Sequence, residues 1–143
     1  MTRAVLDDHL LRDLLADNVP AELDAILAGH QPATTNYYLY RLCRSVVSAA
    51  GGALTGAWNA EQRRALGSRL VTLPSDIEVV PMRTLAYRMA ELAGEHRIST
   101  LGAEAIAAAE SLAAPLCVWS GDDGPGIRRA MEVLGQDYRI IER

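Results

Sequence analysis

The chain has 143 residues, half of them hydrophobic, and a formal net charge of −4, which together predict one domain spanning residues 1–143. The acidic balance argues against a protein coated in basic charge for nucleic-acid binding, although a local basic patch stays open, and because all 14 basic residues are arginine, chemistry that requires lysine is excluded. The sequence has no run of 18 apolar residues to span a membrane and no apolar signal-peptide core at its start, so we expect a soluble, cytoplasmic protein.

Short β-like runs alternate with longer helical ones along the chain. In chain order, we predict a strand at 4–7, helices at 10–17 and 20–29, a strand at 32–35, a helix at 36–50, a flexible break at 51–58, a helix at 59–73, a strand at 77–82, helices at 83–97 and 101–114, a strand at 115–120, a helix at 124–135 and a strand at 138–142. Asn59, with Gln62 three residues later, is typical of a capping box. Ser99 or Thr100 is suited to cap the helix that follows it.

This alternation predicts an α/β fold, a three-layer αβα sandwich with a central, mostly parallel, five-stranded twisted sheet. Two of the strands end on paired acids, Asp7 with Asp8 and Asp122 with Asp123. In open α/β sheets, ligands bind at the carboxyl ends of the strands. Both acid pairs are therefore expected to face one cleft.

The first acid pair resembles the start of a response-regulator receiver domain, where two acids bind magnesium beside a phosphorylated aspartate. That pattern also requires an aspartate after a middle strand and a lysine late in the chain. Residues 25–60 contain no acid, and the chain has no lysine. We therefore set this interpretation aside.

A first strand ends on Asp7, Glu104 opens an alanine-rich helix, and a buried strand leads to Ser120-x-Asp122. In this order, the three motifs resemble the PIN-domain family of metal-dependent nucleases, which includes many bacterial toxin ribonucleases. The resemblance implies a Mg²⁺- or Mn²⁺-dependent endoribonuclease with Asp7, Glu104 and Asp122 as catalytic and metal-binding residues. Asp123 is a further predicted ligand, and Asp8 could assist.

Hydrolysis of a phosphodiester explains why acids would gather at one place. The reaction needs a nucleophilic water and neutralised phosphate charge, and a divalent cation held by carboxylates supplies both. Converging carboxylates would otherwise repel one another and raise each other's pKa values.

Structural roles stay open for several of these residues. Asp8 could cap the first helix, Asp123 could belong to a turn or an N-cap, and Glu104 could complement the dipole of its own helix. The tyrosines of the helix at 36–50 suit core packing or a dimer contact better than base stacking. Those tyrosines are Tyr37, Tyr38 and Tyr40. Among the histidines, only His9 lies beside an acid pair.

The chain departs from the family pattern in the helix after the second strand, where PIN nucleases commonly carry a further acid. Here Arg41 or Arg44 falls near that position. The arginine could pair with the acids and leave a silent binding or regulatory module, or it could bind RNA phosphate beside an active site. We predict RNA-binding roles for Arg41, Arg44 and Ser120. The resemblance further implies an RNA substrate, a small antitoxin partner and a homodimer.

Overall fold

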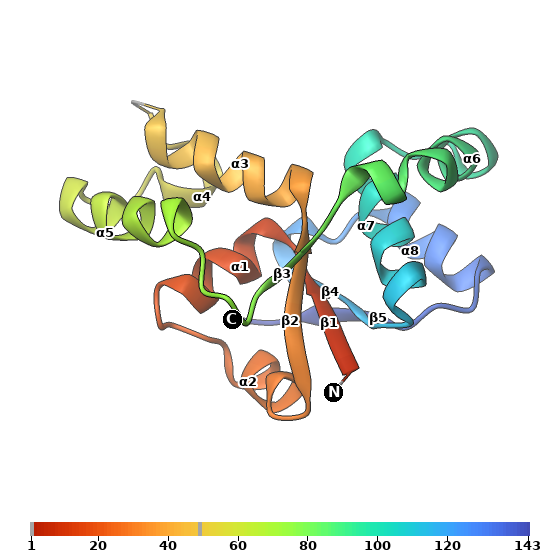
Figure 1. Ribbon diagram of the computed structural model, residues 1–143, viewed down its shortest axis with the longest axis horizontal. Helices are drawn as coiled ribbons and strands as arrows, with labels where there is room; N and C mark the ends of the chain where they lie inside the picture. Colours follow the sequence, from red (N-terminus) through yellow and green to blue (C-terminus); the bar gives the residue numbers. More distant parts are fainter. Residues whose placement is uncertain (1, 49) are drawn as a thin grey trace.

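Five parallel strands form the centre of the molecule, with helices on both faces (Figure 1). The computed structural model describes residues 2–48 and 50–143. The sheet order is β3-β2-β1-β4-β5. The strands are β1 (Thr2–Leu6), β2 (His30–Thr35), β3 (Glu78–Val80), β4 (Leu116–Trp119) and β5 (Tyr138–Ile141). The predicted α/β sandwich is confirmed, and within the described residues every strand pairing is parallel.

Helices connect these strands in the order that parallel pairing requires. They are α1 (Asp8–Leu15), α2 (Ala21–Leu27), α3 (Asn36–Val47), α4 (Gly52–Thr55), α5 (Ala60–Val71), α6 (Ala86–His96), α7 (Thr100–Leu112) and α8 (Pro125–Val133). Short 3-10 turns precede α6, at Met82–Thr84, and follow β4, at Ser120–Asp122. Within the described residues, no helix combines the length and apolar character needed to cross a membrane.

The central strand β1 builds both halves of the core because its side chains alternate between the two faces of the sheet. Val5 packs in a cluster with residues of α6, α7 and α8. Ala4 and Leu6 pack on the other face with Leu10 of α1 and Leu23 of α2. A strand buried on both sides has no polar alternation, as its sequence predicts.

Helix α7 is buried around most of its circumference, from Gly102 to Ala109. Its small side chains let it lie between the sheet and the neighbouring helices α6 and α8. A Cβ atom added at Gly102 would lie 3.0 Å from Cγ1 of Ile127 on α8. The glycine therefore sets how closely α7 and α8 approach.

Helix beginnings follow the predicted caps. Asn59 and Gln62 form the reciprocal capping box at the start of α5. Ser99 caps α7 by accepting a hydrogen bond from the amide of Gly102. Of the two candidates for that position, Ser99 is the capping residue.

The predicted flexible break at 51–58 is wrong in part, because residues 52–55 form the helical turn α4. The side chain of Leu54 is buried in a cluster with α1, α3 and α5. The hydroxyls of Ser45 and Thr55 are 2.8 Å apart, and Arg12 Nη1 donates to the carbonyl of Leu54 at 2.7 Å. Gly51 enters this turn at φ 73°, a left-handed conformation that glycine adopts without strain.

Candidate metal centre

Asp7 joins three elements at the carboxyl edge of the sheet. It follows β1, which pairs with β4, and its amide donates to the carbonyl of Cys117 at 3.1 Å. Its Oδ1 accepts from the amide of Leu10 at 2.8 Å, which makes Asp7 the N-cap of α1. Its Oδ2 accepts from the amide of Trp119 at 2.9 Å. Asp7, and not Asp8, therefore caps the first helix.

Three side chains offer ligand atoms that lie within 4.8 Å of one another. They belong to Asp8 and His9, in the first turn of α1, and to Asp122, in the turn after β4. Asp8 and His9 are buried, whereas the Asp122 side chain is 39% exposed. Among the described residues, this is the group whose spacing suits a metal ion. Asp7, Glu104 and Asp123 lie outside it, and their assignment as ligands stays a prediction.

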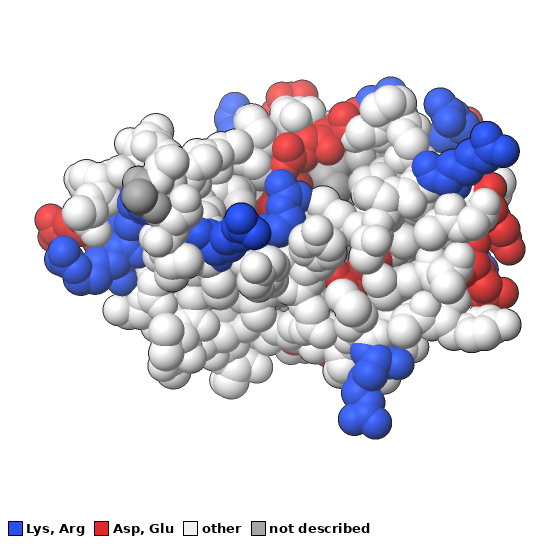
Figure 2. Space-filling view, turned by 90° about the horizontal axis from the view of Figure 1, so that it is seen from above, with Lys and Arg blue, Asp and Glu red and all other residues white. Residues whose placement is uncertain are grey.

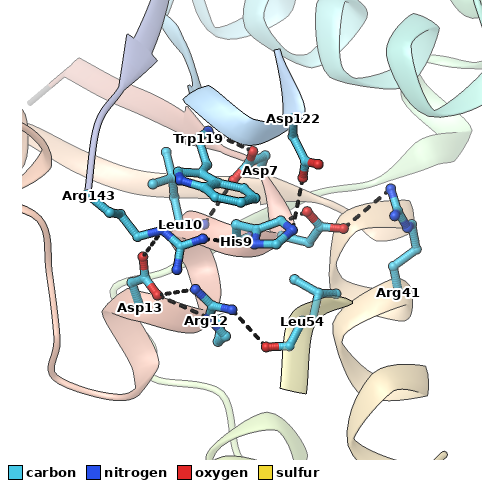
Figure 3. Close-up of polar contacts among 11 residues, drawn as sticks. Asp7, His9, Leu10, Arg12, Asp13, Arg41, Leu54, Trp119, Asp122 and Arg143 are labelled. Carbon is cyan, nitrogen blue, oxygen red and sulfur yellow. Dashed lines mark hydrogen bonds and ion pairs between the residues drawn. The ribbon is translucent and has the colours of Figure 1, made fainter. Parts of the chain in front are cut away.

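His9 is held on three sides (Figure 3). Its Nε2 lies 3.0 Å from Oδ2 of Asp122. Its ring centroid is 4.4 Å from that of Trp119, and its Nδ1 is 3.4 Å from Nη2 of Arg143. The sequence singled out His9 only by its place beside an acid pair, because the partners that orient it come from β4, the turn after it and the residues that follow β5.

Arg41 faces the buried carboxylate of Asp8. Its Nη1 lies 3.4 Å from Oδ2 of Asp8, and its own side chain is 42% exposed. Oδ1 of Asp8 accepts from the amide of His9 at 3.0 Å. Oδ2 accepts no hydrogen bond from the part of the chain that the structure describes. This oxygen has Arg41 as its ion-pair partner and a remaining capacity to accept a hydrogen bond or to bind a cation.

Burial and local hydrogen bonds shift the pKa values of the carboxylates in opposite directions. Burial raises the pKa of Asp7 to about 7, against the lowering effect of its two amide hydrogen bonds. Burial also raises the pKa of Asp8, and Arg41 opposes that shift. The pKa of Asp122 is lowered, chiefly because His9 donates a hydrogen bond to it. The exposed member of the group is thus the one most readily ionised.

Tyr38 is a residue of this site that the sequence assigned to packing. It is 3% exposed, and burial followed by the charges of Asp7 and Asp8 raises the pKa of its phenol well above the ordinary value. A cleft of about 120 Å³ lies beside it. Its lining comprises Asp7, Tyr38, Arg41, Leu101, Val118, Asp122 and Ile127. The helical spacing that predicted a core position was right about burial, but it could not reveal that the ring also borders the acids.

Glu104 occupies a different position from the other acids. Its Oε1 accepts from the amide of Tyr37 at 3.0 Å, in the first turn of α3, whose N-cap is Thr35; Glu104 does not lie in the first turn of its own helix α7. Burial raises its pKa, and the hydrogen bond from the Tyr37 amide lowers it. Its Oε2 has no hydrogen-bond partner among the described residues.

The remaining predicted site residues have partners near the edge of the cluster. Asp123 Oδ1 accepts from the hydroxyl of Tyr138 at 2.8 Å, and its Oδ2 pairs with Arg128. The N-cap of α8 is the next residue, Gly124. Ser120 Oγ donates to Glu142 Oε2 at 3.0 Å. The exposed Arg44 lies one turn beyond Arg41 on α3. On the face of the molecule seen from above, a group of acidic side chains adjoins a band of basic ones (Figure 2).

The donor set fits a hard divalent cation. Mg²⁺ is usually bound by one or two carboxylates while it keeps several waters. Asp8 and Asp122 provide two carboxylates, one buried and one exposed, and the buried one has an oxygen free of hydrogen bonds. These two residues could hold such an ion.

A second, larger cavity of about 1010 Å³ lies between α3 and α5. Val46 and Leu70 line it, and the exposed Val47 and Val71 stand at its rim. Its charged lining residues are Arg63 and Arg64, so it offers an apolar surface with basic charge and not a metal site.

No family model matches the chain, and no curated protein matches it. The geometry of the cluster and the motifs of the sequence are the features that bear on function.

Proposed function

We propose that the protein is a divalent-metal-dependent endoribonuclease of the PIN type. The observation that carries the proposal is the convergence of Asp8, His9 and Asp122 within 4.8 Å at the carboxyl edge of a parallel sheet. This is the edge at which α/β proteins bind their ligands. The order of acidic motifs that resembles the PIN family supports the same class of reaction.

Each residue near the cluster has a separate task in this proposal. Asp8 and Asp122 would hold a Mg²⁺ or Mn²⁺ ion, which would supply an activated water and neutralise phosphate charge. Asp7 fixes the geometry, because it binds α1 and β4 through two amide hydrogen bonds. His9 orients Asp122 through the 3.0 Å contact.

Arg41 is suited to bind the phosphate of the substrate. Its guanidinium lies at the edge of the cleft beside Asp8 and is partly exposed. Guanidinium groups bind phosphate oxygens in pairs, which adds both charge and orientation. Arg44, one turn further along α3, would meet the next part of an RNA backbone. In the wider proposal the protein is a toxin, with a small antitoxin as partner and a second copy in a homodimer.

A silent binding module is the second candidate, and one observation favours it. Arg41 already gives Asp8 a positive partner at 3.4 Å, and both oxygens of Asp7 are engaged by amides. A cluster neutralised in this way would have little need of a cation. Metal binding separates the two candidates: a competent site gains stability from a ligand that binds only the folded chain.

The test is cleavage of a single-stranded RNA with EDTA, Mg²⁺ or Mn²⁺. Asp122→Asn removes the negative charge but retains a carbonyl oxygen that can accept from His9. We expect it to lose the metal-dependent cleavage. Asp24→Asn is the matched control, since Asp24 is an exposed acid on α2 at the opposite end of the sheet (Figure 1). Equal cleavage by all three proteins would refute the site, and absence of cleavage together with absence of metal binding would favour the silent module.

A further inference from the structure

We propose that Arg143 keeps His9 out of the metal coordination sphere and thereby makes the site selective for hard cations that bind through oxygen alone. This inference rests on the proposed metal-dependent function and names the class of metal that the site takes. It concerns which nitrogen of His9 carries the ring proton.

The contacts of Arg143 place a permanent donor beside His9. Its guanidinium carbon lies 4.0 Å from the centroid of the Trp119 ring, and its Nε is 3.7 Å from Oδ2 of Asp13. From this position its Nη2 approaches Nδ1 of His9 at 3.4 Å. A guanidinium has donors and no acceptor, so Nδ1 must accept in this contact.

The same arrangement fixes the other nitrogen. With Nδ1 free of a proton, the proton of the imidazole is on Nε2, where it is donated to Oδ2 of Asp122 at 3.0 Å. The Trp119 ring lies against the imidazole and holds its orientation. Nε2 therefore has no lone pair to offer to an ion held between Asp8 and Asp122.

Metal-binding histidines normally have the opposite environment. Their second nitrogen donates its proton to a carboxylate or a carbonyl, which leaves the first free to bind the ion. For His9 to become a ligand, the proton would have to move to Nδ1, where it would meet the guanidinium of Arg143. The arginine thus opposes nitrogen ligation, and two carboxylates with water remain as the donor set.

Selectivity for the metal follows from this donor set. Imidazole nitrogen suits Zn²⁺, Ni²⁺ and Cu²⁺, whereas carboxylate and water suit Mg²⁺ and Mn²⁺. If His9 is not a ligand, the site lacks the imidazole nitrogen that would most increase its affinity for Zn²⁺, Ni²⁺ and Cu²⁺. His9 acts in this arrangement as a positioning residue for Asp122.

The experiment compares Co²⁺ with Mn²⁺ in the whole chain, by calorimetry and by the visible absorption of bound Co²⁺. Arg143→Met retains an apolar chain against Trp119 but removes the donor. We expect it to bind Co²⁺ about 10- to 100-fold more tightly, the range by which outer contacts change metal affinity, with Mn²⁺ affinity nearly unchanged. His9→Gln keeps an N–H that can donate to Asp122. In the wild-type chain it should leave Co²⁺ binding almost unaltered, but combined with Arg143→Met it should cancel the gain.

Two results would overturn the inference while leaving the proposed function intact. The first is a loss of Co²⁺ affinity and a changed Co²⁺ spectrum when His9→Gln is made alone, because His9 would then already be a ligand. The second is unchanged Co²⁺ binding in both Arg143→Met and Arg143→Gln, with thermal unfolding showing that both variants fold. If no variant binds either metal, the proposed metal-dependent function fails and the inference fails with it.

Discussion

Replacing Asp7 by asparagine should change how the stability of the protein depends on pH. Asp7 is 1% exposed, and its carboxylate accepts hydrogen bonds from the amides of Leu10 and Trp119. Asparagine has the same shape but one acceptor oxygen in place of two. It should therefore lose one of these hydrogen bonds at every pH, at a cost of about 1–3 kcal/mol, and it cannot ionise.

The pH-dependent part follows from the pKa of Asp7, which burial raises from 3.8 to about 7. The folded chain holds this proton more tightly than the unfolded chain does. The stabilisation that the proton provides is therefore present at low pH and is lost as the pH rises through about 7. With these two pKa values, Asp7 alone lowers the free energy of unfolding by about 3 kcal/mol between pH 5 and pH 8.

The assay is urea unfolding of wild type and Asp7→Asn at several pH values from 5 to 8, with EDTA present to exclude metal effects. The difference in unfolding free energy should move by about 3 kcal/mol in favour of the variant across this range. Asp24→Asn, on the exposed face of α2, should track wild type at each pH. A constant difference between Asp7→Asn and wild type would mean that the two amide hydrogen bonds offset burial, and the reasoning would be refuted.

Three further predictions test other parts of the structure. Arg41→Ala removes a partly exposed cation 3.4 Å from Oδ2 of Asp8. Because Arg41 and a metal ion would compete for this carboxylate, the variant should bind Mn²⁺ about fivefold more tightly. Weaker Mn²⁺ binding in calorimetry would contradict this competition. Leu54→Ala should lower the free energy of unfolding in urea by about 2–5 kcal/mol, because the side chain is buried, whereas a flexible segment would lose almost nothing. Glu110→Gln breaks the paired contacts of 2.8 and 2.9 Å with Arg88 and should cost about 0.5–1 kcal/mol near neutral pH. Arg88 lowers the pKa of Glu110, so this cost should disappear in acid as the carboxyl is protonated, and a difference that persists there would contradict the ion pair as its cause.

The fold was accessible from the sequence because its signals are local. Strands β1, β3, β4 and β5 contain short apolar runs, and several of the helices have recognisable caps, such as the Asn59–Gln62 box. Parallel strands bring their carboxyl ends to one edge, so Asp8 and Asp122 meet although they are far apart in the chain. The turn α4 was not accessible, since its glycines indicate freedom, whereas Leu54 and Arg12 restrain it through contacts made only in the folded chain.

The details of the candidate site depend on partners that no local pattern reveals. Glu104 reads as the first-turn acid of its own helix, yet it bonds to the amide of Tyr37 in another. His9 is oriented by Trp119 and Arg143, which the sheet delivers from the far end of the chain. The sequence predicted that acids meet at this edge and named Asp7, Glu104, Asp122 and Asp123, whereas the group within 4.8 Å consists of Asp8, His9 and Asp122.

The width of the cleft depends on the close approach of α7 and α8 at Gly102, whereas its chemistry depends on the charged residues that line it. Ile127, which a methyl group at position 102 would press against, is also part of the wall that surrounds the acids. A methyl group added at position 102 would therefore press on an apolar wall residue of the cleft without replacing any of the charged residues that line it.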